Sequence, residues 1–109
     1  MTEEIRTLKL KNKLGLHARS AAAIVKVVQQ FESKIYIEHN GQTVEGDSIL
    51  DILTLACPYG GTLTIKAQGV DALAVKSELE KLVENKFAIR LFLSIKGKTL
   101  LPPVPSISQ

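Results

Sequence analysis

The chain has 109 residues, of which 45% are hydrophobic and 23% are charged, with a single cysteine and no tryptophan. This length and composition predict one soluble globular domain, and one cysteine excludes a framework of internal disulfides. The formal net charge of +3 suits an acidic protein partner and only weakly indicates nucleic-acid binding.

The first part of the chain changes from a period of two to a helical period and back. Residues 4–11 predict a strand with Leu8 and Leu10 on one face and Ile5 out of phase. Residues 18–31 predict a helix whose apolar stripe is Ala21, Ile24, Val25, Val28 and Phe31. Residues 34–38 and 42–45 predict a hairpin, because Asn40-Gly41 favours the turn that joins two antiparallel strands.

The second part predicts a helix, a strand and a last helix. Residues 48–56 form the first of these, capped by Asp47 or Ser48, with Ile52, Leu55 and Ala56 turned to the core. Residues 62–68 alternate as a strand that buries Leu63, Ile65 and Ala67. Asp71 is expected to cap the last helix, which runs to about residue 86 and buries Ala72, Val75, Leu79, Leu82 and Val83. The order β-α-β-β-α-β-α predicts an α+β open-faced β-sandwich, a four-stranded antiparallel sheet with three helices on one face.

Two apolar stretches have no place in this core. Ile49, Leu50 and Leu53 lie largely on the outer side of the helix over 48–56, so we expect a partner surface there, unless the C-terminal tail covers them. We divide the chain into a domain over 1–86 and an extension over 87–109. The extension alternates from Phe87 to Ile95 and is then rich in proline, which predicts one more strand, packed on the domain or paired with another chain.

The segment Leu14-Gly15-Leu16-His17-Ala18-Arg19-Ser20 carries the predicted chemistry. The unpaired N–H groups and the dipole at the start of a helix attract phosphate, and a histidine is a usable nucleophile near neutral pH. A histidine with an arginine two residues later at this point therefore indicates a phosphorylatable His17, assisted by Arg19. The simpler alternative is a loop histidine that only caps the helix.

Residues 15–21 resemble the active-site signature of the HPr family, the histidine-containing phosphocarriers of the bacterial phosphotransferase system. The resemblance continues through Asn40-Gly41, residues 46–50 and residues 69–72, and covers roughly residues 4–86. One departure is Ser20, because the family usually has proline after the arginine. A serine there offers a hydroxyl group and less rigidity than proline.

The resemblance implies a phosphocarrier, not an enzyme. His17 would take a phosphoryl group on Nδ1 from enzyme I, which is charged by phosphoenolpyruvate, and pass it to an enzyme II A-type subunit. Ser48 aligns with the regulatory serine that HPr kinase/phosphorylase modifies in Gram-positive members, although a serine at a helix start is usually just a cap. No phosphate-binding loop, dinucleotide fingerprint or zinc spacing is present, so we expect no cofactor and no metal.

Two alternatives stay open. Residues 46–53 resemble nitrogen-branch paralogues, so the relay would then control signalling and move no sugar. A small nucleic-acid module is suggested only by the isoelectric point of about 9.1, and the scarce aromatic residues do not favour it. The apolar runs fall short of the ~20 residues of a membrane span and the N-terminus lacks a signal-peptide pattern, so we expect a cytoplasmic protein without a membrane span.

Overall fold

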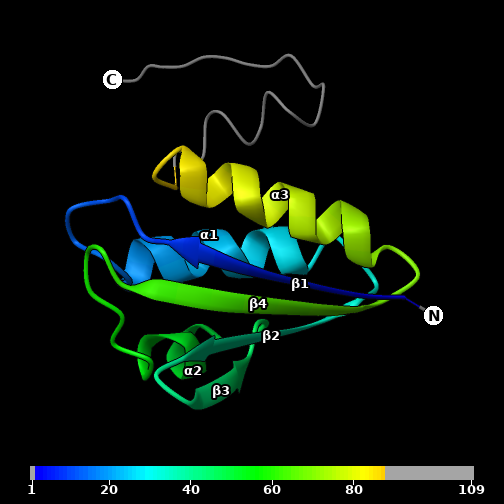
Figure 1. Ribbon diagram of the computed structural model, residues 1–109, viewed down its shortest axis with the longest axis horizontal. Helices are drawn as coiled ribbons and strands as arrows, with labels where there is room; N and C mark the ends of the chain where they lie inside the picture. Colours follow the sequence, from blue (N-terminus) through cyan, green and yellow to red (C-terminus); the bar gives the residue numbers. More distant parts are fainter. Residues whose placement is uncertain (1, 88–109) are drawn as a thin grey trace.

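The computed structural model describes residues 2–87, which form a four-stranded antiparallel sheet with three helices on one face (Figure 1). The predicted fold class is confirmed. The elements are β1 (Thr2–Lys9), α1 (Ala18–Val28), β2 (Lys34–His39), β3 (Gln42–Glu45), α2 (Ile49–Leu53), β4 (Thr62–Gly69) and α3 (Ala72–Glu84). Within these residues no helix is long and apolar enough to cross a membrane.

The sheet has the order β1-β4-β2-β3, so the first strand pairs with the last. Leu8 is paired with Leu63, and Ile37 is paired with Ile65, which brings the inward side chains of three strands together under the helices. Those side chains are buried, as the period-two pattern predicts, while Ile5 is 57% exposed on the opposite face. The predicted turn at Asn40-Gly41 is confirmed, since both residues have positive φ (51° and 82°).

The helices close the core from the other side. Ala72, Val75, Leu79, Leu82 and Val83 of α3 are all buried, so the predicted stripe of the last helix is confirmed. On α1 the stripe is wider than predicted, because Ala23 and Val27 are buried as well. Helix α1 ends at Val28, three residues before Phe31, which is half-buried against the core.

Helix α2 is shorter than predicted. It ends at Leu53, and Ala56 has a φ of 52°, which turns the chain into the loop before β4. Ile52 and Leu55 reach the core as expected, but Ala56 is exposed, so its predicted inward position is wrong. The reason is that the left-handed turn ends the helical repeat before it can carry Ala56 onto the inner face.

The C-terminal extension begins differently from the predicted strand. Phe87 has a φ of 64°, which is not a strand conformation, and its side chain is only 7% exposed. Phe87 therefore packs on the domain as the end of a turn after α3. The rest of the predicted extension, residues 88–109, lies outside the described residues.

Asp71 stands at the N-cap of α3 but does not cap that helix with its side chain. Its carboxylate instead accepts hydrogen bonds from the N–H groups of Glu32 and Ser33, both at 2.9 Å, and from the Ser33 hydroxyl. The predicted capping role is therefore wrong. The carboxylate ties the connection between α1 and β2 to the start of α3, across nearly forty residues of sequence.

Replacing Asp71 with asparagine should reduce stability at neutral pH and flatten its acid dependence. The hydrogen bond from the Ser33 hydroxyl, with those from the backbone, lowers the pKa of Asp71. A carboxylate with a lowered pKa in the folded state stabilises the fold above its unfolded pKa of about 3.9, and this stabilisation is lost as pH falls through the folded pKa. Urea unfolding between pH 7 and pH 2 checks this. Asp47→Asn is the control, because the Asp47 carboxylate has no hydrogen bond within residues 2–87; equal pH profiles for the two variants would contradict the prediction.

Candidate functional site

His17 occupies the N-cap of α1, with extended backbone (φ −142°, ψ −176°) and a half-buried side chain. Its Nδ1 accepts a hydrogen bond from the N–H of Arg19 at 3.2 Å. An accepting Nδ1 holds its lone pair toward the helix, so the neutral ring carries its proton on Nε2. The nucleophilic nitrogen thus faces the positive end of α1, and the N–H of Ala18 beside it has no partner among residues 2–87.

Ser20 fixes the backbone of His17 through its hydroxyl group. The N–H of His17 donates to Ser20 Oγ at 2.8 Å, and that hydroxyl is placed to donate to the carbonyl oxygen of His17 (3.0 Å) or of Gly15 (3.3 Å). With the bond to His17 Nδ1, this makes a capping box around the helix start. Ser20 is only 1% exposed, so these bonds are shielded from water. These hydrogen bonds restrict the backbone at the start of α1, as the ring of a proline at this position would.

The loop before His17 is in close contact with the loop that follows α2. Gly15 has a φ of 67°, and a Cβ atom on it would lie 2.7 Å from the carbonyl oxygen of Cys57. The N–H of Leu16 donates to that same oxygen at 2.9 Å. Asn12 braces the loop from the other side, since its Nδ2 donates to the Gly15 carbonyl oxygen at 2.6 Å. The position of His17 therefore depends on a close contact between two loops far apart in sequence.

A hollow of about 200 Å³ opens beside His17. Arg19 lines it and is exposed, and no carboxylate within residues 2–87 forms an ion pair with its guanidinium group. Lys13 lines the same hollow and is exposed as well. Unpaired cations next to a nucleophilic imidazole favour the approach of an anionic phosphoryl group.

Ser48 and the predicted apolar surface lie on α2. Ser48 is the N-cap, and its Oγ accepts a hydrogen bond from the N–H of Asp51 at 3.2 Å. Leu50 is 76% exposed and Ile49 is 38% exposed. Leu53 is half-buried and packs on the core, so it lies less on the outer surface than predicted. Helix α2 has five residues and contacts both α1 and β3, which leaves little of it facing outward.

The second histidine and the cysteine belong to the scaffold. A ring nitrogen of His39, Nδ1, is 2.9 Å from the carbonyl oxygen of Thr62, the first residue of β4. Cys57 is buried, and burial raises the pKa of its thiol. Within residues 2–87 no group of three or more histidine, cysteine or acidic side chains is placed to hold a metal ion.

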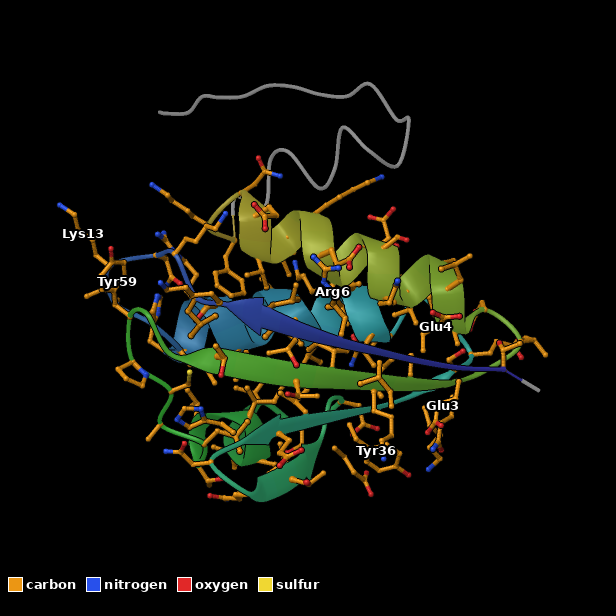
Figure 2. The ribbon with its side chains drawn as sticks, in the orientation of Figure 1. Glu3, Glu4, Arg6, Lys13, Tyr36 and Tyr59 are labelled. Atoms are coloured by element: carbon orange, nitrogen blue, oxygen red, sulfur yellow. The ribbon has the colours of Figure 1, made fainter. Side chains whose placement is uncertain are left out.

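Three residues at this end of the molecule were missed from the sequence. Leu14 and Tyr59 are 76% and 64% exposed, and they belong to the two loops that meet at Gly15. Figure 2 shows Lys13 and Tyr59 at the same end of the molecule. The third is Asn12, whose Nδ2 donates a hydrogen bond to the carbonyl oxygen of Gly15 in the loop before His17. A leucine between a lysine and a glycine in a turn is a sequence pattern that could have identified Leu14 as an exposed apolar residue. No comparable pattern in the neighbouring sequence identifies Tyr59.

A protein family model described as the PTS HPr component phosphorylation site matches residues 5–85. The chain belongs to the HPr family. This confirms the resemblance drawn from residues 15–21, and it identifies the domain as a phosphocarrier domain of the phosphotransferase system.

Three HPr relatives illustrate the match. The phosphocarrier protein HPr of Treponema pallidum is 35% identical over 83 residues, which cover 76% of this chain and 94% of that protein. The phosphocarrier protein NPr of Shewanella violacea is 34% identical over 87 residues, covering 80% and 96%. The crystal structure of HPr-C-His from Thermoanaerobacter tengcongensis superposes with a TM-score of 0.74 at 33% identity, covering 89% of this chain and 99% of that one.

Proposed function

We propose that His17 is the residue that carries the phosphoryl group, on Nδ1, between enzyme I and an enzyme II A-type subunit. The observation that supports this most is the hydrogen bond from the Arg19 N–H to His17 Nδ1, which directs the lone pair of that nitrogen to the helix N-terminus. In the transfer the bond from Nδ1 to phosphorus forms while the donor's phosphorus–nitrogen bond breaks. The proton stays on Nε2, so the ring becomes a phosphorylated imidazolium.

Phosphorylation of Nδ1 displaces its hydrogen bond from Arg19. The freed N–H of Arg19 and the unpaired N–H of Ala18 then donate to the phosphoryl oxygens, and the Arg19 guanidinium pairs with them. Little covalent chemistry is asked of the protein, because phosphoryl transfer depends mainly on positioning and electrostatic stabilisation. The protein acts as a stoichiometric carrier in this scheme.

Incubation of the full chain with enzyme I and phosphoenolpyruvate tests the proposal. We expect a single acid-labile, base-stable phosphoryl group, detected as one added phosphate by mass spectrometry. A chain that remains unmodified would reject the carrier role.

The sugar branch is the leading proposal, and the nitrogen branch is the second candidate. The similarity to NPr of Shewanella violacea supports the second one. Phosphate uptake from the enzyme I of each branch, measured side by side with the same chain, separates them. A faster rate with the nitrogen-branch donor would assign the chain to signalling without sugar transport.

Ser48 is proposed as a regulatory phosphorylation site. A phosphate there adds a charge of about −1.5 to −2 next to the exposed Leu50, where Asp47 and Asp51 are already negative. An acidic partner surface would then be repelled. We expect HPr kinase/phosphorylase and ATP to place one acid-stable phosphate on the wild-type chain and none on Ser48→Ala; phosphate on neither chain would remove this proposal and leave the role of His17 intact.

A further inference from the structure

The charged side chains in the described lining of the hollow beside His17 are all basic. It is formed by Asn12, Lys13, Leu14, His17, Arg19, Ser20, Lys86 and Phe87, and no aspartate or glutamate is among these residues. The chain has eleven acidic residues, so their absence from this lining leaves an excess of positive charge. We call this surface the cationic hollow.

Lys86 lines the cationic hollow although it is far from His17 in the sequence. It follows α3 in a left-handed turn, with a φ of 56°, and its N–H donates to the carbonyl oxygen of Val83 at 3.0 Å. Phe87 continues the turn, with its N–H 2.7 Å from the carbonyl oxygen of Leu82 and its ring buried. The buried ring and the two hydrogen bonds fix the backbone that carries Lys86, while the lysine side chain is exposed.

An ion pair holds the same end of α3 near the His17 loop. Lys11, directly before Asn12, pairs with Glu84 at 2.6 Å. Because Glu84 is the last residue of α3, this pair links the strand end that leads into the loop to the helix end that leads into Lys86.

The charge at this place matters for a bound phosphoryl group. The C-terminal end of a helix carries a partial negative charge of about half an electron, which disfavours an anion. A lysine two residues after the end of α3 puts a full positive charge where that helix end would otherwise repel phosphate. Arg19 supplies one positive charge to a phosphoryl group that carries nearly two negative ones, so a further cation in the same hollow adds to its stabilisation.

We propose that Lys86 is a second phosphate-binding residue, which pairs with the phosphoryl group on His17 together with Arg19. This inference rests on the proposed role of His17. The family model itself matches residues 5–85, so Lys86 lies one residue after that match.

Phosphoramidate is the probe for this proposal, because it phosphorylates histidine without a protein partner. Its phosphorus–nitrogen bond breaks as the bond to His17 Nδ1 forms, and ammonia leaves with the electron pair. We expect Lys86→Gln to slow phosphate uptake by about two- to fivefold at low salt, the factor for an exposed ion pair, and to shorten the lifetime of the phosphorylated form. Lys86→Arg should keep the wild-type rate of phosphate uptake. The rate of Arg19→Gln serves as the reference for how much the loss of one cation slows that uptake.

Lys34→Gln is the matched control, since Lys34 is an exposed lysine that lines a different hollow and has no ion pair within residues 2–87. The difference in phosphate-uptake rate between Lys86→Gln and Lys34→Gln should shrink in 0.5 M salt. At that salt concentration the Debye length is only ~4 Å, so exposed charges are screened. Equal rates for the two variants, in a chain that accepts phosphate, would overturn the role of Lys86 alone. A wild-type chain that accepts no phosphate from phosphoramidate or from enzyme I would overturn the proposed function together with it.

Discussion

His17→Asn should take up no detectable phosphate from enzyme I and phosphoenolpyruvate, while its stability stays close to that of the wild type. Asparagine at an N-cap accepts a hydrogen bond from the first turn, as His17 Nδ1 does, so the helix start is kept. The nucleophilic nitrogen is lost, and with it the only route to a phosphoryl group bound at the helix N-terminus. His17→Ala should lose the same uptake and about 1 kcal/mol of stability as well, because it removes the cap.

The chain provides its own control in His39, its other histidine. His39 Nδ1 lies 2.9 Å from the carbonyl oxygen of Thr62, and His39 does not line the hollow beside His17. His39→Ala should therefore accept phosphate at the wild-type rate. The measurement is the added mass of one phosphoryl group, with circular dichroism to confirm folding. Uptake by His17→Asn, or its loss in His39→Ala, would move the carrier site away from His17.

Gly15→Ala is expected to destabilise the domain by about 2–5 kcal/mol. A left-handed φ costs a non-glycine residue roughly 1–2 kcal/mol, and forcing atoms into a packed site costs about 1–3 kcal/mol more. The new Cβ would lie 2.7 Å from the Cys57 carbonyl oxygen and 2.8 Å from the Tyr59 nitrogen, and both are backbone atoms that cannot rotate away. Urea unfolding monitored by circular dichroism gives the change in the free energy of unfolding.

Gly60→Ala separates the two costs of that substitution. Gly60 also has a positive φ, 83°, but a Cβ atom on it would meet nothing within 4 Å. Its replacement should cost only the backbone term, about 1–2 kcal/mol. If the two variants lost equal stability, the close approach of the two loops at Gly15 would contribute nothing.

The prediction of local structure succeeded where burial repeats along the chain. The side chains of α3 that face the core recur at intervals of three and four, and those of β4 recur at intervals of two, so both elements could be found from the sequence. Asn40-Gly41 likewise fixes its own turn, because positive φ is a property of those residues. The same local reading placed His17 at the start of a helix, which the structure confirms.

The wrong predictions concern residues whose contacts are formed with parts of the chain that are distant in sequence. Asp71 has the right residue type to cap α3, yet its carboxylate binds the N–H groups of Glu32 and Ser33. Leu53 was expected on the outer side of its helix, yet it is half-buried and packs on the core. In both cases two contacts were available, and only the packing of elements against one another determines which one forms.

From the amino-acid sequence alone we could predict most of the helices and strands, the resemblance to the family and a histidine at a helix start, because each of these depends on neighbours within a few residues. Tertiary structure decided what surrounds that histidine. The pairing of β1 with β4 and the approach of the Cys57–Tyr59 loop to Gly15 join parts of the chain about forty or more residues apart. Lys86 lines the same hollow as His17 only because α3 runs parallel to β1, from the Lys76–Glu4 pair through Arg6–Glu80 to Lys11–Glu84. No periodicity within one element encodes such contacts, since they depend on the order of strands in the sheet.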